Sequence, residues 1–117
     1  MDNVEFSSGR KTVIDVGEKE LKNIRELLKK YLPDTLVWAY GSRVKFTATK
    51  ISDLDLVAFI TEVQQGNLSD LQEAFDESNL PFRVDVLNWN KIPDKFKENI
   101  QKEYVVVQEV ENNDQKN

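Results

Sequence analysis

The amino-acid sequence predicts one domain built as a β-sheet packed by α-helices, in an α/β or an α+β arrangement. Helical and strand-like patterns alternate along the chain, which is typical of a sheet covered by helices. A length of 117 residues supports one hydrophobic core and leaves too little chain for a second. Neither an internal repeat nor a linker divides the sequence. The order of the strands stays open on these patterns alone.

The first helix is expected in residues 17–34, where apolar side chains recur at helical spacing and Pro33 stops the pattern. Three strands are expected in residues 35–41, 54–60 and 82–89. These segments are apolar and rich in β-branched and aromatic residues, as buried strands are.

A second helix is expected in residues 69–80, between the second and third strands. Ser69 and Gln72 have the spacing of a capping box, which would begin this helix. Gly66 and Asn67 are expected to form the turn before it.

The last helix is expected to begin at Pro93, because proline is favoured in a first helical turn. Apolar residues continue from there at helical spacing through Phe96, Ile100 and Tyr104. Residues 105–107 are β-branched and are expected to leave this helix as a short strand.

Both chain ends are polar. Residues 1–12 are expected to be a flexible segment and residues 109–117 a disordered tail, which leaves the domain at residues 13–108. No apolar run approaches the roughly 20 residues of a membrane span, and the polar start lacks the apolar centre of a signal peptide. A cytoplasmic location without membrane contact is therefore expected.

The amino-acid composition limits which metals, catalytic groups and partners the protein can use. The chain contains neither cysteine nor histidine, which excludes thiolate sites and the commonest transition-metal ligand and general base. A bound metal would therefore be a hard ion held by oxygen. The net charge of -5 argues against direct binding of nucleic acid, because that role depends on surplus lysine and arginine.

Three aspartates stand out against this background. Asp53 and Asp55 are two residues apart at the start of a strand, so they point to the same side about 6.6 Å apart along the chain. Asp85 lies in the third expected strand and reaches the other two if the strands are neighbours. Three carboxylates this close repel one another unless a cation compensates them.

Oxygen ligands of this kind suit Mg²⁺ or Mn²⁺, which commonly bridge carboxylates and substrate phosphates. The matching chemistry is metal-assisted phosphoryl or nucleotidyl transfer. Gly41 lets the backbone approach a phosphate, Ser42 can donate to its oxygens, and Arg43 can add a charge-assisted contact.

Each feature also has a plain structural interpretation. A lone Asp-x-Asp is often a solvated strand entry, a lone Gly-Ser is often a turn, and Asp85 alone would be an exposed acid on an edge strand. Trp38 and Trp89 could stack on adenine, but packing is the favoured interpretation. For Lys45 and Lys50 a solvated surface is favoured over steering of an anionic donor.

The combination is more specific than its parts. Gly41-Ser42, ten intervening residues, Asp53-Leu54-Asp55 and Asp85 on a later strand resemble the pattern of the DNA polymerase β-like nucleotidyltransferase superfamily. The segments VWAYGSRVKFTATKISDLDLVAF, LPFRVDVLNW and IQKEYVVVQ look like the minimal nucleotidyltransferases, the MNT family often paired with HEPN-domain proteins. The resemblance covers roughly residues 13–108.

The resemblance implies an α+β nucleotidyltransferase fold with a mixed sheet flanked by helices. It implies that Asp53 and Asp55 bind two Mg²⁺ ions, with Mn²⁺ as the substitute, and that Asp85 completes the metal and catalytic site by activating an acceptor hydroxyl.

Gly41, Ser42 and Arg43 would hold the triphosphate of the donor, for which the family implies ATP. One departure is Phe46, where many relatives carry a second glycine. Its bulk would either narrow the phosphate loop or pack at its rim.

For the paired family members, the resemblance implies transfer of AMP to a tyrosine of a HEPN toxin, a ribonuclease that is thereby silenced. This chain would then be the antitoxin. The length of the chain agrees with a protein partner as acceptor, because the chain has no extra domain to grip an acceptor. The alternatives are a catalytically silent module that neutralises its partner by binding, and a transferase acting on a small hydroxylated molecule such as an aminoglycoside. The sequence leaves a homo-oligomer open.

Overall fold

A computed structural model describes residues 13–110. Along the chain its elements are α1 (Glu18–Tyr31), β1 (Val37–Tyr40), α2 (Ser42–Lys45), β2 (Leu54–Ala58), η2 (Glu62–Gln64), α3 (Gln65–Asp76), β3 (Val84–Asn88), η3 (Trp89–Lys91), α4 (Asp94–Lys102) and β4 (Val105–Gln108). The predictions for residues 1–12 and 111–117 lie outside the described residues. Within the described part, no helix combines the length and apolar character needed to cross a membrane.

The strands form one mixed sheet in the order β3-β2-β1-β4. β2 and β3 run parallel, and β1 is antiparallel to both of its neighbours, β2 and β4. The predicted mixed sheet is confirmed, including the short final strand. The parallel register places Asp55 directly opposite Asp85, so the fold itself makes neighbours of two acids thirty residues apart in the chain.

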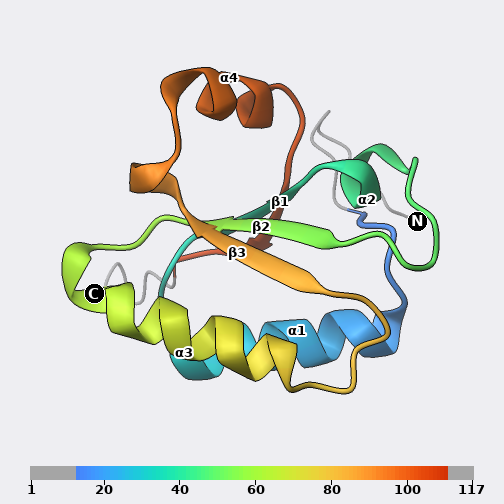
Figure 1. Cartoon of the computed structure of the whole chain (residues 1–117), viewed down its shortest axis with the longest axis horizontal. Helices are drawn as coiled ribbons and strands as arrows, with labels where there is room; N and C mark the ends of the chain where they lie inside the picture. Colours follow the sequence, from blue (N-terminus) through green and yellow to red (C-terminus); the bar gives the residue numbers. More distant parts are fainter. Residues whose placement is uncertain (1–12, 111–117) are drawn as a thin grey trace, which may run out of the picture.

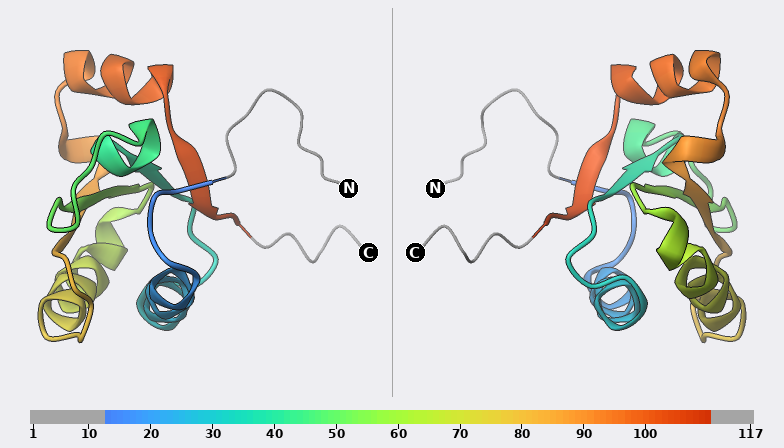
Figure 2. Two further views of the ribbon diagram at one scale, coloured as in Figure 1. Left: turned by 90° about the vertical axis from the view of Figure 1, so that its right-hand side faces the viewer. Right: turned by 90° about the vertical axis from the view of Figure 1, so that its left-hand side faces the viewer.

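Helices cover both faces of this sheet. α1 and α3 lie side by side against one face, and α4 stands on the opposite side (Figure 1, Figure 2). Alternate residues of β2, Leu54 and Leu56, are fully buried in the core with Ile24 and Leu28 of α1. Burying such side chains stabilises the fold by about 1.5–3 kcal/mol each. Because strand side chains alternate, Asp55 faces the other side.

The start of α3 differs from the prediction. Ser69 lies inside the helix, which begins four residues earlier at Gln65, and Gly66 and Asn67 are helical. The capping box is instead made by Thr61 and Gln64, whose side chains and backbone N–H groups pair at the preceding 3₁₀ turn. That turn continues directly into α3, so no separate turn is needed before it.

Gln72 has a different function from the predicted cap. Its amide nitrogen donates to the carbonyl of Val84 at 2.7 Å, and its amide oxygen accepts from the N–H of Val86 at 2.9 Å. These bonds join α3 to the free edge of β3, which would otherwise leave strand groups unpaired. They fix the strand that carries Asp85.

The second face of the sheet carries an aromatic cluster, defined as Trp38, Phe59, Trp89 and Tyr104. Trp38 stacks on Tyr104 with ring centroids 3.8 Å apart and meets Phe59 edge-on at 4.7 Å. Trp89 lies 4.7 Å from Phe59 and 5.5 Å from Trp38. Both tryptophans therefore pack against other aromatic rings, in agreement with the favoured interpretation of these residues.

Candidate active site

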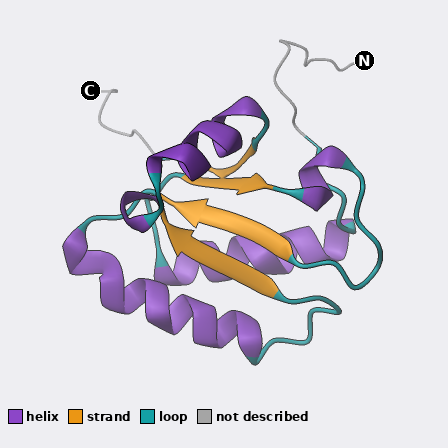
Figure 3. Ribbon diagram, turned by 45° about the horizontal axis from the view of Figure 1, so that its top comes forward, coloured by secondary structure: helices purple, strands orange, loops and turns teal. Residues whose placement is uncertain are grey.

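Asp53, Asp55 and Asp85 converge on the face of the sheet that α4 overlies. One carboxylate oxygen of each lies within 4.8 Å of the others. Asp53 precedes β2, whereas Asp55 and Asp85 are register partners on β2 and β3. Figure 3 shows the strands of the sheet lying side by side. Asp53 is exposed and the other two are partly buried. The sequence-based grouping of the three acids is thus present in the structure.

Asp55 carries most of the electrostatic strain of this cluster. Burial, together with the charges of Asp53 and Asp85, raises the pKa of Asp55 from 3.8 to about 6. A divalent cation bound there would neutralise the carboxylates and so remove the repulsion among them. An all-oxygen donor set of this size fits Mg²⁺ or Mn²⁺ and would not select a soft metal.

Arg83 was not among the predicted site residues. Its Nε donates to Oδ1 of Asp85 at 2.8 Å, and the arginine side chain is 57% exposed. This hydrogen bond, with the charge of Asp85, raises the pKa of the Arg83 side chain. A signal was present in the sequence, because residues two apart in a strand share a face. Arg83 orients the Asp85 carboxylate at the rim of the site.

Gly41 lies against the acids for a steric reason. Its backbone has φ 88° and ψ -157°, a region open almost only to glycine. A Cβ added there would lie 2.7 Å from Oδ2 of Asp55. The residue therefore lets the chain pass close to the carboxylate of Asp55. Ser42, the next predicted phosphate contact, begins α2 and is partly buried.

Arg43 is placed differently from a free phosphate ligand. It is 5% exposed, and all of its guanidinium nitrogens donate to backbone carbonyls. The acceptors are the carbonyls of Asp15 at 2.7 Å, Lys50 at 3.0 Å, Ser52 at 3.0 Å and Thr49 at 3.3 Å.

The guanidinium of Arg43 also lies 4.1 Å from the ring centroid of Phe82. Its charge is thus directed into the loop that ends at Asp53 and toward the segment that leads into β3. In this arrangement the arginine holds the two segments that deliver the aspartates, which the sequence pattern did not reveal.

Phe46 closes the short helix α2. It adopts the left-handed conformation with φ 60° and ψ 38°, and 53% of it is exposed. A glycine would adopt this backbone without strain. With half of its surface exposed, the Phe46 side chain lies at the rim of the loop.

A cavity of about 330 Å³ opens beside the aspartates, between β1, α2 and α4. It is lined by Tyr40, Gly41, Lys45, Asp55, Phe96, Asn99, Ile100 and Glu103. Tyr40 is the register partner of Asp55. Burial and the charges of Asp55 and Asp85 raise the pKa of Tyr40 to about 12, so its hydroxyl stays protonated.

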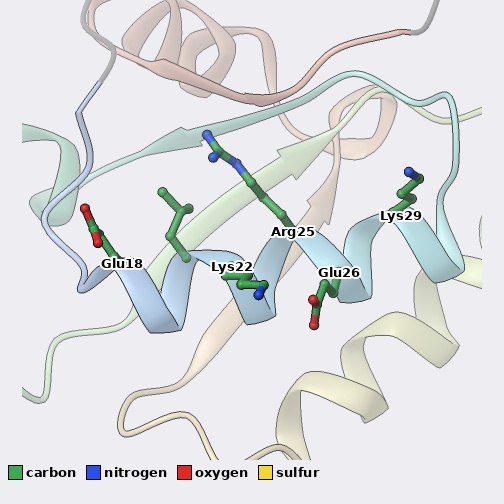
Figure 4. Close-up of a pocket in the computed structure, with 6 residues that line it drawn as sticks. Glu18, Lys22, Arg25, Glu26 and Lys29 are labelled. Atoms are coloured by element: carbon green, nitrogen blue, oxygen red, sulfur yellow. The ribbon is translucent and has the colours of Figure 1, made fainter.

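Another hollow, of about 460 Å³, runs along α1 (Figure 4). Its walls carry side chains of both charges, Glu18, Lys22, Arg25, Glu26 and Lys29. Arg25 points toward the strands and donates to the carbonyl of Val107 at 3.4 Å. Mixed charges of this kind are typical of a solvated helix face, and the acidic site with its adjoining cavity is the stronger candidate.

Comparison with known proteins identifies the family of this chain. The family described as polymerase beta, nucleotidyltransferase matches residues 22–113. A protein of Haemophilus influenzae named "Probable protein adenylyltransferase MntA" is 46% identical over 99 residues, covering 84% of this chain and 87% of that protein.

Two solved structures show the same fold. A crystal structure described as a toxin-antitoxin with AMP-PNP has a TM-score of 0.55 at 17% identity, over 76% of this chain and 73% of that chain. A crystal structure of the toxin-antitoxin MntA-HepT has a TM-score of 0.51 at 14% identity, over 80% and 73% of the two chains. Given the family match and the 46% identical relative, this chain belongs to the polymerase beta nucleotidyltransferase family.

Proposed function

We propose that this protein is a Mg²⁺-dependent adenylyltransferase that moves AMP from ATP to a hydroxyl of a protein partner. The observation that carries the proposal is the set of three aspartate oxygens within 4.8 Å of one another, next to Gly41. The relative named as a probable protein adenylyltransferase supports the choice of reaction. The solved structure with AMP-PNP supports an adenine nucleotide as donor.

Asp53, Asp55 and Asp85 would hold the metal, with two Mg²⁺ ions the expected number. Bound there, the metal would polarise the donor phosphates and lower the barrier to attack by a hydroxyl. Gly41 and Ser42 would position the phosphates, because the glycine permits close backbone approach and the serine supplies a donor.

The proposed reaction is a displacement at the α-phosphorus of ATP. The acceptor oxygen forms a bond to that phosphorus, the bond to the oxygen bridging the β-phosphate breaks, and pyrophosphate leaves with the electron pair. Asp85 takes the hydroxyl proton. Its carboxylate is already oriented by the 2.8 Å hydrogen bond from Arg83.

We further propose that the acceptor is a tyrosine of a HEPN-domain toxin, with this chain as the antitoxin. The complexes among the similar solved structures are toxin-antitoxin pairs, which supports a protein partner of that class. The described fold adds no second domain around the aspartates that would hold an acceptor. The partner therefore has to bring its own hydroxyl to the site.

Incubation of the protein with its HEPN partner, Mg²⁺ and ATP labelled at the α-phosphate tests the proposal. The wild type should label the partner, and Asp53→Asn with Asp55→Asn should remove the label. A control with Asp70→Asn and Glu77→Gln removes two charges from exposed positions at α3 and should leave labelling intact. Equal labelling by the aspartate double variant would refute the mechanism. Suppression of toxicity by an unlabelled complex would favour a silent binding module.

A further inference from the structure

We propose that the cavity between β1 and α4 receives the nucleoside part of the donor, with Phe96 as the platform for the base and Asn99 as the residue that reads it. This inference rests on the proposed function, since it concerns how the same site selects adenine. The cavity begins at Gly41 and Asp55, where the phosphates are proposed to bind, and extends to α4.

The order of the strands determines which part of the reaction uses this cavity. Asp85 lies on β3 and the cavity lies on β1, so they flank Asp55 from opposite sides of β2. The carboxylate that takes the acceptor's proton has to lie on the acceptor's side. The acceptor therefore approaches over β3, and the β1 side is left for the nucleoside.

The walls of the cavity suit a nucleoside. Tyr40 and Phe96 meet edge-on, with ring centroids 5.7 Å apart and an interplanar angle of 85°. This contact holds the Phe96 ring in place while it stays only partly buried. Stacking on an aromatic ring is a general means of binding a base. Lys45, exposed at the rim, adds positive charge near the phosphates.

Asn99 can distinguish adenine from guanine. Its exposed amide, on the α4 wall, offers one donor group and one acceptor group. Adenine presents the complementary pair at its N6 amino group and N7, whereas guanine presents two acceptors at O6 and N7. An asparagine in this position therefore favours ATP over GTP. The volume of about 330 Å³ falls within the range of about 300–1,000 Å³ for small-molecule pockets.

Steady-state labelling of the partner with ATP and with GTP tests the inference. Phe96→Ala should raise the KM for ATP about tenfold through lost stacking, and Phe96→Tyr should restore it. Asn99→Ala should lower the preference for ATP over GTP about tenfold. The KM for the partner should stay unchanged in each variant. Glu98→Ala, exposed on the same helix outside the cavity lining, is the matched control.

Unchanged KM and unchanged nucleotide preference in Phe96→Ala and Asn99→Ala would overturn the inference. A rise in the KM for the partner with no change for ATP would also overturn it, because the cavity would then receive the acceptor. If the wild type labels no partner, the proposed function fails separately. Binding of AMP-PNP with Mn²⁺ then decides the inference, and equal affinity in wild type and both alanine variants would contradict it.

Discussion

Gly41→Ala tests the link between the backbone and the acidic site most sharply. At φ 88° and ψ -157° an alanine is strained, which costs about 1–3 kcal/mol of folding free energy. The new methyl would also lie 2.7 Å from Oδ2 of Asp55, which is much shorter than the ordinary contact distance of 3.4–4 Å. The carboxylate has to move, and displacements of this order at a reacting centre lower rates about 100-fold.

The assay has two parts. Urea unfolding measures the free energy of unfolding, and labelling of the partner with Mg²⁺ and ATP measures transfer. Gly66→Ala is the matched control, because it lies within α3 and an added Cβ there meets nothing within 4 Å. It should stabilise the protein by about 0.5–1 kcal/mol and leave transfer unchanged. A Gly41→Ala protein with wild-type stability and wild-type transfer would refute the reasoning.

The remaining predictions concern three other residues. The pKa of Asp55 is raised to about 6, so the stability given by its protonated form is full below pH about 3.8 and is lost as the pH rises through about 6. Urea unfolding without divalent ions should therefore find Asp55→Asn more stable than wild type at about pH 7 and the difference shrinking toward about pH 4, whereas a constant difference would contradict this. Arg43→Met should lower the free energy of unfolding by about 2–4 kcal/mol and weaken Mn²⁺ binding, because four carbonyls lose their donor. Arg43→Lys should restore little of the stability and little of the Mn²⁺ binding. Unchanged Mn²⁺ binding in a folded Arg43→Met protein would exclude the idea that Arg43 positions the aspartates. Phe46→Gly should raise the free energy of unfolding by about 1 kcal/mol by relieving the left-handed backbone, and a loss of stability in urea would contradict that explanation.

The sequence predicts the main elements because their periodicities are long and regular. α1 and the strands β1, β2 and β3 follow from apolar spacing, and the short strand β4 follows from its β-branched run. The start of α3 is missed because capping-box spacing occurs at both Ser69 and Thr61, and only the path of the chain decides which is used.

In the site, too, features set by neighbouring residues are predicted from the sequence, whereas features set by distant residues are not. Asp53 and Asp55 are placed together by strand periodicity, whereas the register of β2 with β3, which brings in Asp85, depends on the fold. Arg43 illustrates the limit of residue type as a guide. An arginine after Gly-Ser suits a phosphate, but its burial among carbonyls depends on a loop whose path no short motif specifies.

Crystallography with Mn²⁺ and AMP-PNP tests the central claim most directly, because the anomalous scattering of manganese locates the ion. Mn²⁺ should lie within coordination distance of Asp53, Asp55 and Asp85 and contact the nucleotide phosphates. Manganese bound at another place, or a nucleotide whose phosphates lie away from the three carboxylates, would contradict the account.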